Sequence, residues 1–448
     1  MTAAEPAPPR RRRTVSAAVT AVLGVGLFLA GGLGLAPPSG PSGPTDGAAD
    51  LSAGPAVPAD IRGLQERLRA TPDDAEALGS LGLAYVQQAR TTADPSFYPK
   101  AEAALTRSLT AQPADNATAT AGMAALAAAR HDFAAALDWA QKAVALAPDN
   151  STVYGILADA CTQLGRYPES FEAVQHMVDL RPGTPSLSRA SYAWELRGDT
   201  AAATEDMQRA LDDANTPADR SFALYHLSQL ALDNGDPRTA LTHAEAGLRT
   251  APGTASLLEA RARAKAALGD PASAVADLRQ AVAQLPQPEY VLELGELLES
   301  LGRTDEAAQQ YTVFRAEQQL FADNGVAPDT DAALFEADHG DAGKALTIAE
   351  QGLRTRPFLE MNDAYAWALH VNGRDQEALR QSDQALATGM RNALFHYHRG
   401  MILQALGRSA DARSELVTAL AINPSFHPLY APAARTALSG LAALAASS

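Results

Sequence analysis

Few residues in this chain have the types and spacing that catalysis or metal binding requires. Cys161 is its one cysteine, and helical periodicity places it among apolar neighbours, where a thiol is normally structural. His396 and His398 are two residues apart, so their rings point to different sides of a helix and cannot hold one metal ion together. The sequence has no Gly-rich phosphate loop, His-Glu-x-x-His run or nucleophile elbow. We therefore predict a non-catalytic protein without a metal or cofactor.

The composition predicts an all-α protein. Hydrophobic residues make up 46% of the 448 residues, whereas aromatic residues make up only 6% and alanine is abundant. Alanine favours helices, and β-sheets favour β-branched and aromatic residues. The net charge of −16 disfavours nucleic acid as a partner because the surface repels phosphates, and a single cysteine excludes an intramolecular disulfide.

The N-terminus has the pattern of a membrane anchor. Four consecutive arginines, Arg10 to Arg13, precede an uncharged stretch at residues 15–36. As a helix this stretch spans about 33 Å, close to the roughly 30 Å of a bilayer core. Because basic residues stay on the cytoplasmic side, we expect residues 1–14 inside the cell and everything after the helix outside.

A cleaved signal peptide is the competing interpretation of the N-terminus, and it would make the protein secreted. The apolar stretch is longer than a typical signal core, and Pro37 follows the small-residue site that ends at Ala36. Residues 37–58 consist mainly of Gly, Pro, Ser and Ala. Such a segment cannot bury enough apolar surface to fold, so we predict a disordered linker.

A glycine recurs along the remaining sequence with nearly constant spacing. Its positions are Gly165, Gly198, Gly235, Gly269, Gly302, Gly340, Gly373 and Gly407. The gaps are 33, 37, 34, 33, 38, 33 and 34 residues. A sustained period in this range indicates a solenoid of helix pairs.

The clearest unit covers residues 291–314. Its first helix has apolar or small residues at positions i, i+3, i+4 and i+7, namely Val291, Leu294, Gly295 and Leu298. Gly302 ends this helix. The apolar face of the second helix carries Ala307, Tyr311 and Phe314. We expect the small residues Gly295 and Ala307 where the two helices cross.

This pattern resembles the tetratricopeptide-repeat (TPR) family, in a membrane-anchored bacterial type. The resemblance implies a right-handed superhelix, an α-solenoid of antiparallel helix pairs, over residues 59–448. We count about ten repeats between residues 74 and 424, preceded by a helix at 61–70 and followed by a capping helix at 429–445. The second and eighth units fit poorly, the eighth because Asp329 stands at a usually apolar position. The first unit carries an insertion at about residues 90–100.

In this family the first helices line a concave groove that holds a protein or peptide. The positions beside the core stripe give these candidate partner-binding residues: Tyr192, Tyr225, Gln229, Asp363, Trp367, His370, Tyr397 and Met401. The alternative is that these side chains pack between neighbouring helices. The predicted lining is acidic, which favours a basic or neutral partner: Asp159, Glu195, Glu259, Glu296, Glu299 and Asp363, with Arg263 as the exception.

The sequence thus predicts a scaffold or assembly factor that holds a partner at the outer face of a membrane. One alternative is a regulatory or structural subunit that self-assembles through its end caps. Another is a chaperone similar to those of cytochrome c maturation, whose repeats residues 64–85 resemble. A third is an enzyme that uses the insertion at 90–100, which offers Asp94, Tyr98 and its two basic ends.

Overall fold

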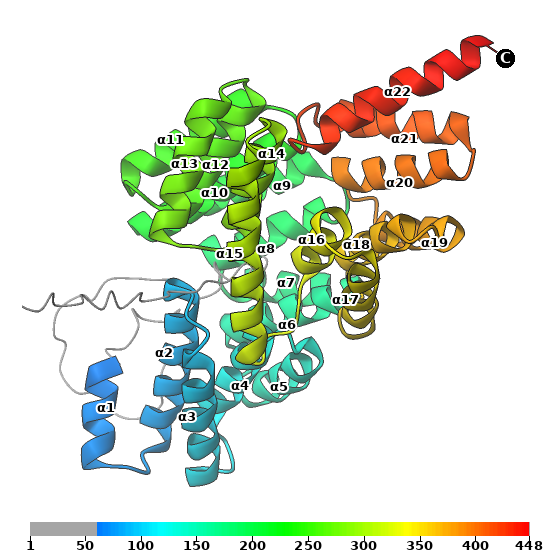
Figure 1. Cartoon of the computed structure of the whole chain (residues 1–448). Coiled ribbons are helices and arrows are strands. Elements are labelled where there is room, and N and C mark those ends of the chain that lie inside the picture. Colours follow the sequence, from blue (N-terminus) through cyan, green and yellow to red (C-terminus); the bar gives the residue numbers. More distant parts are fainter. Residues whose placement is uncertain (1–60, 448) are drawn as a thin grey trace, which may run out of the picture.

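The computed structural model describes residues 61–447, and in this range the chain forms helices joined by short loops (Figure 1). The all-α prediction is confirmed for these residues. The helices are α1 (Ile61–Ala70), α2 (Ala75–Thr92), α3 (Phe97–Ala111), α4 (Ala117–Ala129), α5 (Phe133–Leu146), α6 (Ser151–Gln163), α7 (Tyr167–Leu180), α8 (Thr184–Glu195), α9 (Thr200–Asp213), α10 (Pro217–Asp233), α11 (Pro237–Thr250), α12 (Ala255–Ala267), α13 (Pro271–Gln284), α14 (Pro288–Ser300), α15 (Thr304–Asp323), α16 (Thr330–His339), α17 (Ala342–Thr355), α18 (Leu359–Val371), α19 (Asp375–Ala385), α20 (Ala393–Ala405), α21 (Ser409–Ile422) and α22 (Tyr430–Ser447).

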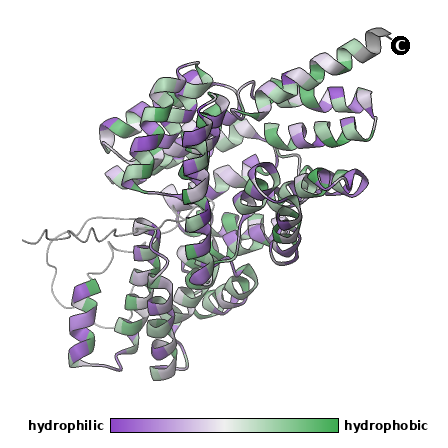
Figure 2. Cartoon of the chain, viewed as in Figure 1, coloured by the Kyte–Doolittle hydropathy of each residue, from purple (hydrophilic) through white to green (hydrophobic). Residues whose placement is uncertain are grey.

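From α2 to α21 the helices form pairs, each packed most closely on its own partner and then on the next pair. Helix α1 precedes the first pair, and α22 packs on α21 after the last. Figure 2 shows hydrophobic and hydrophilic residues interspersed along the helices, as expected when one side of each helix is buried.

Local signals in the sequence set the ends of these helices. Asp199, Asp236 and Asp270 each accept a hydrogen bond from a first-turn backbone N–H, as an N-cap does. At the other end, Gly165 takes a left-handed φ of +68°, and the next N–H returns to the carbonyl of Cys161. This hydrogen bond closes the helix terminus, and glycine adopts such a φ without strain.

The pair α14–α15 packs as its sequence predicts. Gly295 lies against Tyr311, and a Cβ on Gly295 would come 2.5 Å from the ring. Val291, Leu298 and Phe314 are buried in the same cluster. The expectation that a small residue lets these two helices approach closely is confirmed.

The extra residues predicted for the first unit at about 90–100 lie partly in its helices, because α2 continues to Thr92 and α3 begins at Phe97. The prediction for Asp329 was wrong. Asp329 does not occupy an apolar core position. It precedes α16 as its N-cap, and its side chain accepts a hydrogen bond from the backbone N–H of Ala332.

The solenoid folds back on itself, so that distant units touch. The glycine after α6, Gly165, would place a Cβ 2.8 Å from the carbonyl oxygen of Pro357, which follows α17. A Cβ on Gly198 would overlap the carbonyl oxygen of Gly389 in the same way. Asn423, after α21, donates a hydrogen bond to the carbonyl of Leu232 at the end of α10. We call these three meetings the inter-layer contacts.

Side chains strengthen the inter-layer contacts. The Tyr167 hydroxyl accepts a hydrogen bond from the backbone N–H of Leu359, which lies 192 residues further along the chain. The guanidinium of Arg356 donates to Gln163 and lies 3.1 Å from the ring of His131. Helices α16–α21 form a second layer on the earlier repeats. Hydrogen bonds as well as backbone contacts therefore hold this layer in place.

Helix α15 is the longest of the helices described and joins remote parts of the fold. Figure 1 shows it running from beside α14 toward α4. Phe321 at its end and Val326 in the next loop are buried in one cluster with Val86 and Tyr98 of the first repeat. The carbonyl of Ala327 lies 3.0 Å from Nδ1 of His131.

Within residues 61–447, no helix combines the length and the hydropathy needed to cross a bilayer. The predicted anchor at residues 15–36 and the predicted linker at 37–58 lie outside this range.

Candidate functional site: an acidic hollow

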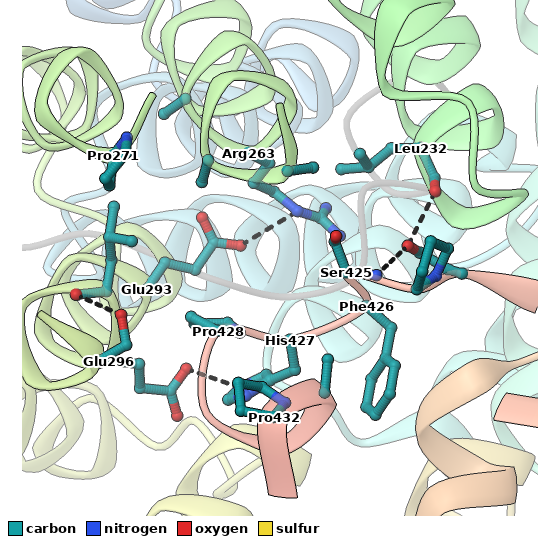
Figure 3. Close-up of a pocket in the computed structure, with 18 of the residues that line it drawn as sticks. Leu232, Arg263, Pro271, Glu293, Glu296, Ser425, Phe426, His427, Pro428 and Pro432 are labelled. Atoms are coloured by element: carbon teal, nitrogen blue, oxygen red, sulfur yellow. Dashed lines mark hydrogen bonds and ion pairs between the residues drawn. The ribbon is translucent and has the colours of Figure 1, made fainter. Parts of the chain in front are cut away.

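The first helices of several repeats meet around a hollow of about 390 Å³. Helices α8, α10, α12, α14, α16 and α20 line it, together with the loop between α21 and α22. A second hollow of about 300 Å³ adjoins it and shares Arg263, Glu293, Glu296 and His427 (Figure 3). We call the two together the acidic hollow.

Carboxylates dominate the wall of the larger part of the acidic hollow. Arg263 and Arg391 are the two arginines there. Seven acidic residues face them: Glu195, Asp233, Glu289, Glu293, Glu296, Asp331 and Asp338. Helix α14 supplies three of these at positions i, i+4 and i+7, which is one face of a helix. The hollow is therefore a region of negative potential.

Burial changes the protonation of several of these acids. It raises the pKa of Glu195 to about 8, with Asp233 and Glu360 adding to the effect. Burial and neighbouring carboxylates also raise the pKa values of Glu293 and Asp331 well above the usual range. These groups hold their protons to a higher pH than exposed carboxyls do, because they are buried and because like charges lie close together. A cation in the hollow would reverse the effect.

Arg263 is surrounded by acceptors. Its Nη1 donates to Gln229 at 2.7 Å, and its guanidinium lies 3.5 Å from Glu259 and 3.9 Å from Glu293. Burial alone would lower the pKa of Arg263, but Asp233, Glu259 and Glu293 raise it further than burial lowers it. This arginine is therefore fixed in place by the walls and neutralises only part of their charge.

Glu296 differs from Glu195, Glu293 and Asp331, because its surroundings favour the ionised form. Its carboxylate lies 3.0 Å from Nε2 of His427 and 3.4 Å from Nε2 of His339. Burial would raise its pKa, but the charge and hydrogen bonds of the two histidines lower it to about 2. Figure 3 shows His427 pointing to Glu296 from the loop before α22.

Aromatic rings connect this wall to the end of the chain. The ring of Tyr430 stacks on His427 with centroids 4.1 Å apart, and its hydroxyl bonds to Asp338. The other oxygen of Asp338 accepts a hydrogen bond of 2.8 Å from the indole N–H of Trp367. Thus α22 and its preceding loop close one side of the hollow.

The structure places many of the predicted partner-binding residues inside the protein. Tyr225, Asp363, Trp367 and Tyr397 are buried. Asp363 pairs with His398 at 2.8 Å. The rings of Trp367 and Tyr397 pack in the same cluster, as the alternative of packing between helices describes.

The other four candidates are half-buried and engaged with neighbours. The hydroxyl of Tyr192 donates to Glu360 at 3.0 Å, and Gln229 accepts from Arg263. His370 lies 2.5 Å from Asp375, and Met401 packs against the cluster that contains Trp367. None of the eight lines the acidic hollow. A role in partner binding stays a prediction for all of them.

Three residues of the predicted acidic lining do line the hollow, namely Glu195, Arg263 and Glu296. Glu299 does not, since it accepts a hydrogen bond from Tyr311 instead. Glu289 and Glu293 were not predicted from the sequence, although their spacing with Glu296 places all three on one face of a helix. It also missed Asp331 and Asp338, because α16 was assigned to a poorly fitting repeat.

Cys161 is buried, and burial raises the pKa of its thiol to about 11. A thiol in this state is a poor nucleophile at neutral pH. In the part of the chain that the structure covers, no group of three or more His, Cys, Asp or Glu side chains is arranged to hold a metal ion.

Residues 259–319 match the sequence profile described as a tetratricopeptide repeat. This range runs through α12–α15, two of the helix pairs that recur along the chain. Residues 259–319 are therefore tetratricopeptide repeats. No curated protein matches this chain by sequence.

Solved structures similar to this chain share little sequence with it. The human IFIT1 dimer with m7Gppp-AAAA is 16% identical, with a TM-score of 0.46 over 73% of this chain and 76% of that one. A tetratricopeptide repeat protein from Parabacteroides merdae is 18% identical, with a TM-score of 0.34 over 58% of this chain and 98% of that one. PilW, described as a type IV pilus biogenesis factor, is 17% identical, with a TM-score of 0.37 over 45% of this chain and 92% of that one.

Proposed function

We propose that this protein is a non-catalytic scaffold whose acidic hollow holds a cationic segment of a partner protein. The observation that supports this is the surplus of carboxylates over arginines in one hollow lined by first helices. TPR repeats generally bind proteins, and lysine or arginine side chains would supply the charge that the walls lack. Burial, together with neighbouring carboxylates, raises the pKa values of Glu195, Glu293 and Asp331, and a bound cation would offset this effect.

The test is fluorescence anisotropy of the full-length protein with a labelled peptide that alternates lysine and leucine. The same peptide with glutamate in place of lysine is the control ligand. We expect binding of the lysine peptide only, and weaker binding at high salt because charges at the rim are screened. Equal binding of the two peptides would contradict the proposal.

A pair of double variants locates the peptide. Glu293→Gln with Asp331→Asn removes two carboxyls that a bound cation would ionise, and should weaken binding by about tenfold or more, the size of close interfacial charge pairs. Glu172→Gln with Asp179→Asn makes the same amide substitutions on the exposed side of α7 and should have little effect. If both double variants lose the same affinity, the peptide responds to net charge and not to the hollow.

Binding should also release protons, because a cation lowers the pKa of carboxyls that burial has raised. Calorimetric titrations in two buffers of different ionisation enthalpy measure this release directly. An identical heat in both buffers would mean that the carboxyls of the hollow do not take part.

We propose further that residues 15–36 anchor the protein in a membrane, with the repeats on the outer side. The supporting observation is the arginine run before an uncharged stretch of bilayer length. Protease added to intact cells should digest the repeats, while the protein stays in the membrane fraction. Recovery of a shortened chain in the medium would instead indicate signal cleavage.

A further inference from the structure

A separate cavity of about 540 Å³ lies where the first repeat faces the middle of the solenoid. Helices α2 and α3 contribute to one side, and the beginnings of α10, α12 and α14 to the other. Aromatic rings and small apolar side chains form most of its wall, including Tyr98, Phe222, Tyr225 and Tyr290. It shares only Glu289 with the acidic hollow, so the two are distinct sites.

Three polar side chains of this aromatic cavity have no partner among the described residues. Tyr98 is 0% exposed and Ser221 is 7% exposed, and neither hydroxyl makes a hydrogen bond to a residue that the structure describes. A buried polar group without a partner destabilises a protein by about 1–3 kcal/mol. Two such groups in one cavity indicate that the space is shaped for a ligand that satisfies them.

The third polar group is a cation. Arg90 makes no hydrogen bond or ion pair in the described part of the chain, and one of its terminal nitrogens is buried and unsatisfied. Burial lowers the pKa of its guanidinium to about 10, so it stays charged at neutral pH. Asp159 lies near enough to act on Arg90 electrostatically, but both of its carboxylate oxygens bind Arg189. Within residues 61–447, Arg90 therefore has no counter-ion of its own.

Helix termini add to the positive potential. Helices α12 and α14 begin at this cavity, and neither has a side-chain cap on its first-turn N–H groups. Uncapped N–H groups and the helix dipole favour an anion. Helix α10 also begins here, but Thr216 caps it.

One acidic group limits the charge of the ligand. Glu289 lines the same cavity, and burial raises its pKa. Wherever this carboxyl is ionised, it repels a dianion more strongly than a ligand with a single negative charge. The planar fork of a guanidinium also matches a carboxylate, which can accept two hydrogen bonds from it.

We propose that the aromatic cavity binds a small organic monocarboxylate with an aromatic body. The carboxylate accepts hydrogen bonds from Arg90, Tyr98 and Ser221, and the body packs between Phe222 and Tyr290. The cavity volume falls within the roughly 300–1,000 Å³ of small-molecule sites.

The test is isothermal titration calorimetry of the full-length protein with 4-phenylbutyrate as the probe. The matched alcohol, 4-phenylbutanol, has the same body without the charge, and phenyl phosphate carries a second charge. We expect the carboxylate to bind at least about tenfold more tightly than either. Equal affinity of acid and alcohol, or no binding of the acid, would overturn the proposal.

Single substitutions test which residues of the aromatic cavity contact the ligand. Arg90→Met should weaken 4-phenylbutyrate at least about tenfold, and Tyr98→Phe and Ser221→Ala by about fivefold each. Glu289→Gln should strengthen binding, because it removes the like charge. Arg107→Met, on α3 but outside the cavity, is the matched control and should bind as the parent does.

Thermal stability separates a ligand site from a structural role. Without ligand, Arg90→Met should melt at or above the temperature of the parent, because an unpartnered buried cation is removed. A lower melting temperature together with unchanged affinity would show that Arg90 serves the fold and would overturn the proposal. If Arg90→Met does not fold, the proposal is tested by Glu289→Gln, which should bind 4-phenylbutyrate more tightly than the parent does.

Discussion

Changing Glu296 to Gln should loosen the attachment of α22. The Glu296 carboxylate binds His427 from the loop before that helix and His339 from α16. Gln keeps the size and one acceptor oxygen but loses the charge. The substitution therefore tests the ion pairs without leaving a cavity.

The magnitude follows from the pKa of Glu296, which is lowered from 4.5 to about 2. A shift of one pKa unit corresponds to about 1.4 kcal/mol, so the ionised form gains about 3 kcal/mol from its surroundings. The side chain is only 12% exposed, so solvent screens little of this interaction. We expect the variant to lose up to about 3 kcal/mol in the transition that releases α22.

The loss should depend on pH in both directions. The lowered pKa of Glu296 gives stability that is complete above about pH 4.5 and disappears as the pH falls toward 2. Burial lowers the pKa of His339, but its hydrogen bond and charge contacts with Glu296 raise it overall, above 6.5. That contribution is complete below pH 6.5 and disappears as the pH rises through the folded value. The difference between parent and variant should therefore be largest between about pH 4.5 and 6.5.

Trp367 reports this transition locally, because its ring lies 6.1 Å from that of Tyr430 at the start of α22. With Trp139 and Trp194 changed to Phe, urea titrations followed by Trp367 fluorescence give the difference in free energy at each pH. The matched control is Glu172→Gln, an exposed acid on α7. A difference that stays constant from pH 3 to 8 would refute the reasoning, because it would show that neutral hydrogen bonds hold Glu296.

Three further predictions use single substitutions or one reagent. Gly198→Ala should lower the melting temperature more than Gly302→Ala: both residues have a left-handed φ, +74° and +72°, but only at Gly198 would the new Cβ overlap the carbonyl of Gly389. Trp367→Ala should cost about 3–5 kcal/mol of unfolding free energy in urea, the usual loss for a buried aromatic ring; unchanged stability with lost partner binding would instead support the groove assignment made from sequence. Iodoacetamide should not modify Cys161 of the folded protein at neutral pH, because burial raises the pKa of the thiol to about 11, and mass spectrometry before and after unfolding checks this.

The local structure could be predicted from the sequence because it depends on short-range rules. Helix ends follow from residues such as Gly165 and Asp199, and the close packing of α14 on α15 follows from Gly295 opposite Tyr311. Part of the acidic hollow was predictable for the same reason, since residues at fixed helical spacing on neighbouring repeats share a face.

The inter-layer contacts could not be predicted in this way. Gly198 and Gly302 occupy the same position in their repeats and have nearly the same φ, yet one meets a carbonyl of a distant loop and the other meets open space. The atom that lies against Gly198 is a backbone carbonyl oxygen, which every residue type has. The amino-acid sequence therefore does not indicate this contact. The aromatic cavity was missed similarly: Arg90 and Tyr98 were noticed as a short segment, but Ser221 and Tyr290 reach them only through the curvature of the solenoid.

The inter-layer contacts also have a consequence for synthesis of the chain. Each joins segments about 190 residues apart, for example Tyr167 with Leu359 and Leu232 with Asn423. At translation rates of about 5–20 residues per second, the early repeats wait about 10–40 s for the segment that covers them. During that interval each helix pair can form from local contacts, but Gly165, Gly198 and their neighbours present an uncovered edge. The order of emergence therefore makes this edge the part of the newly made protein that most needs protection from other chains.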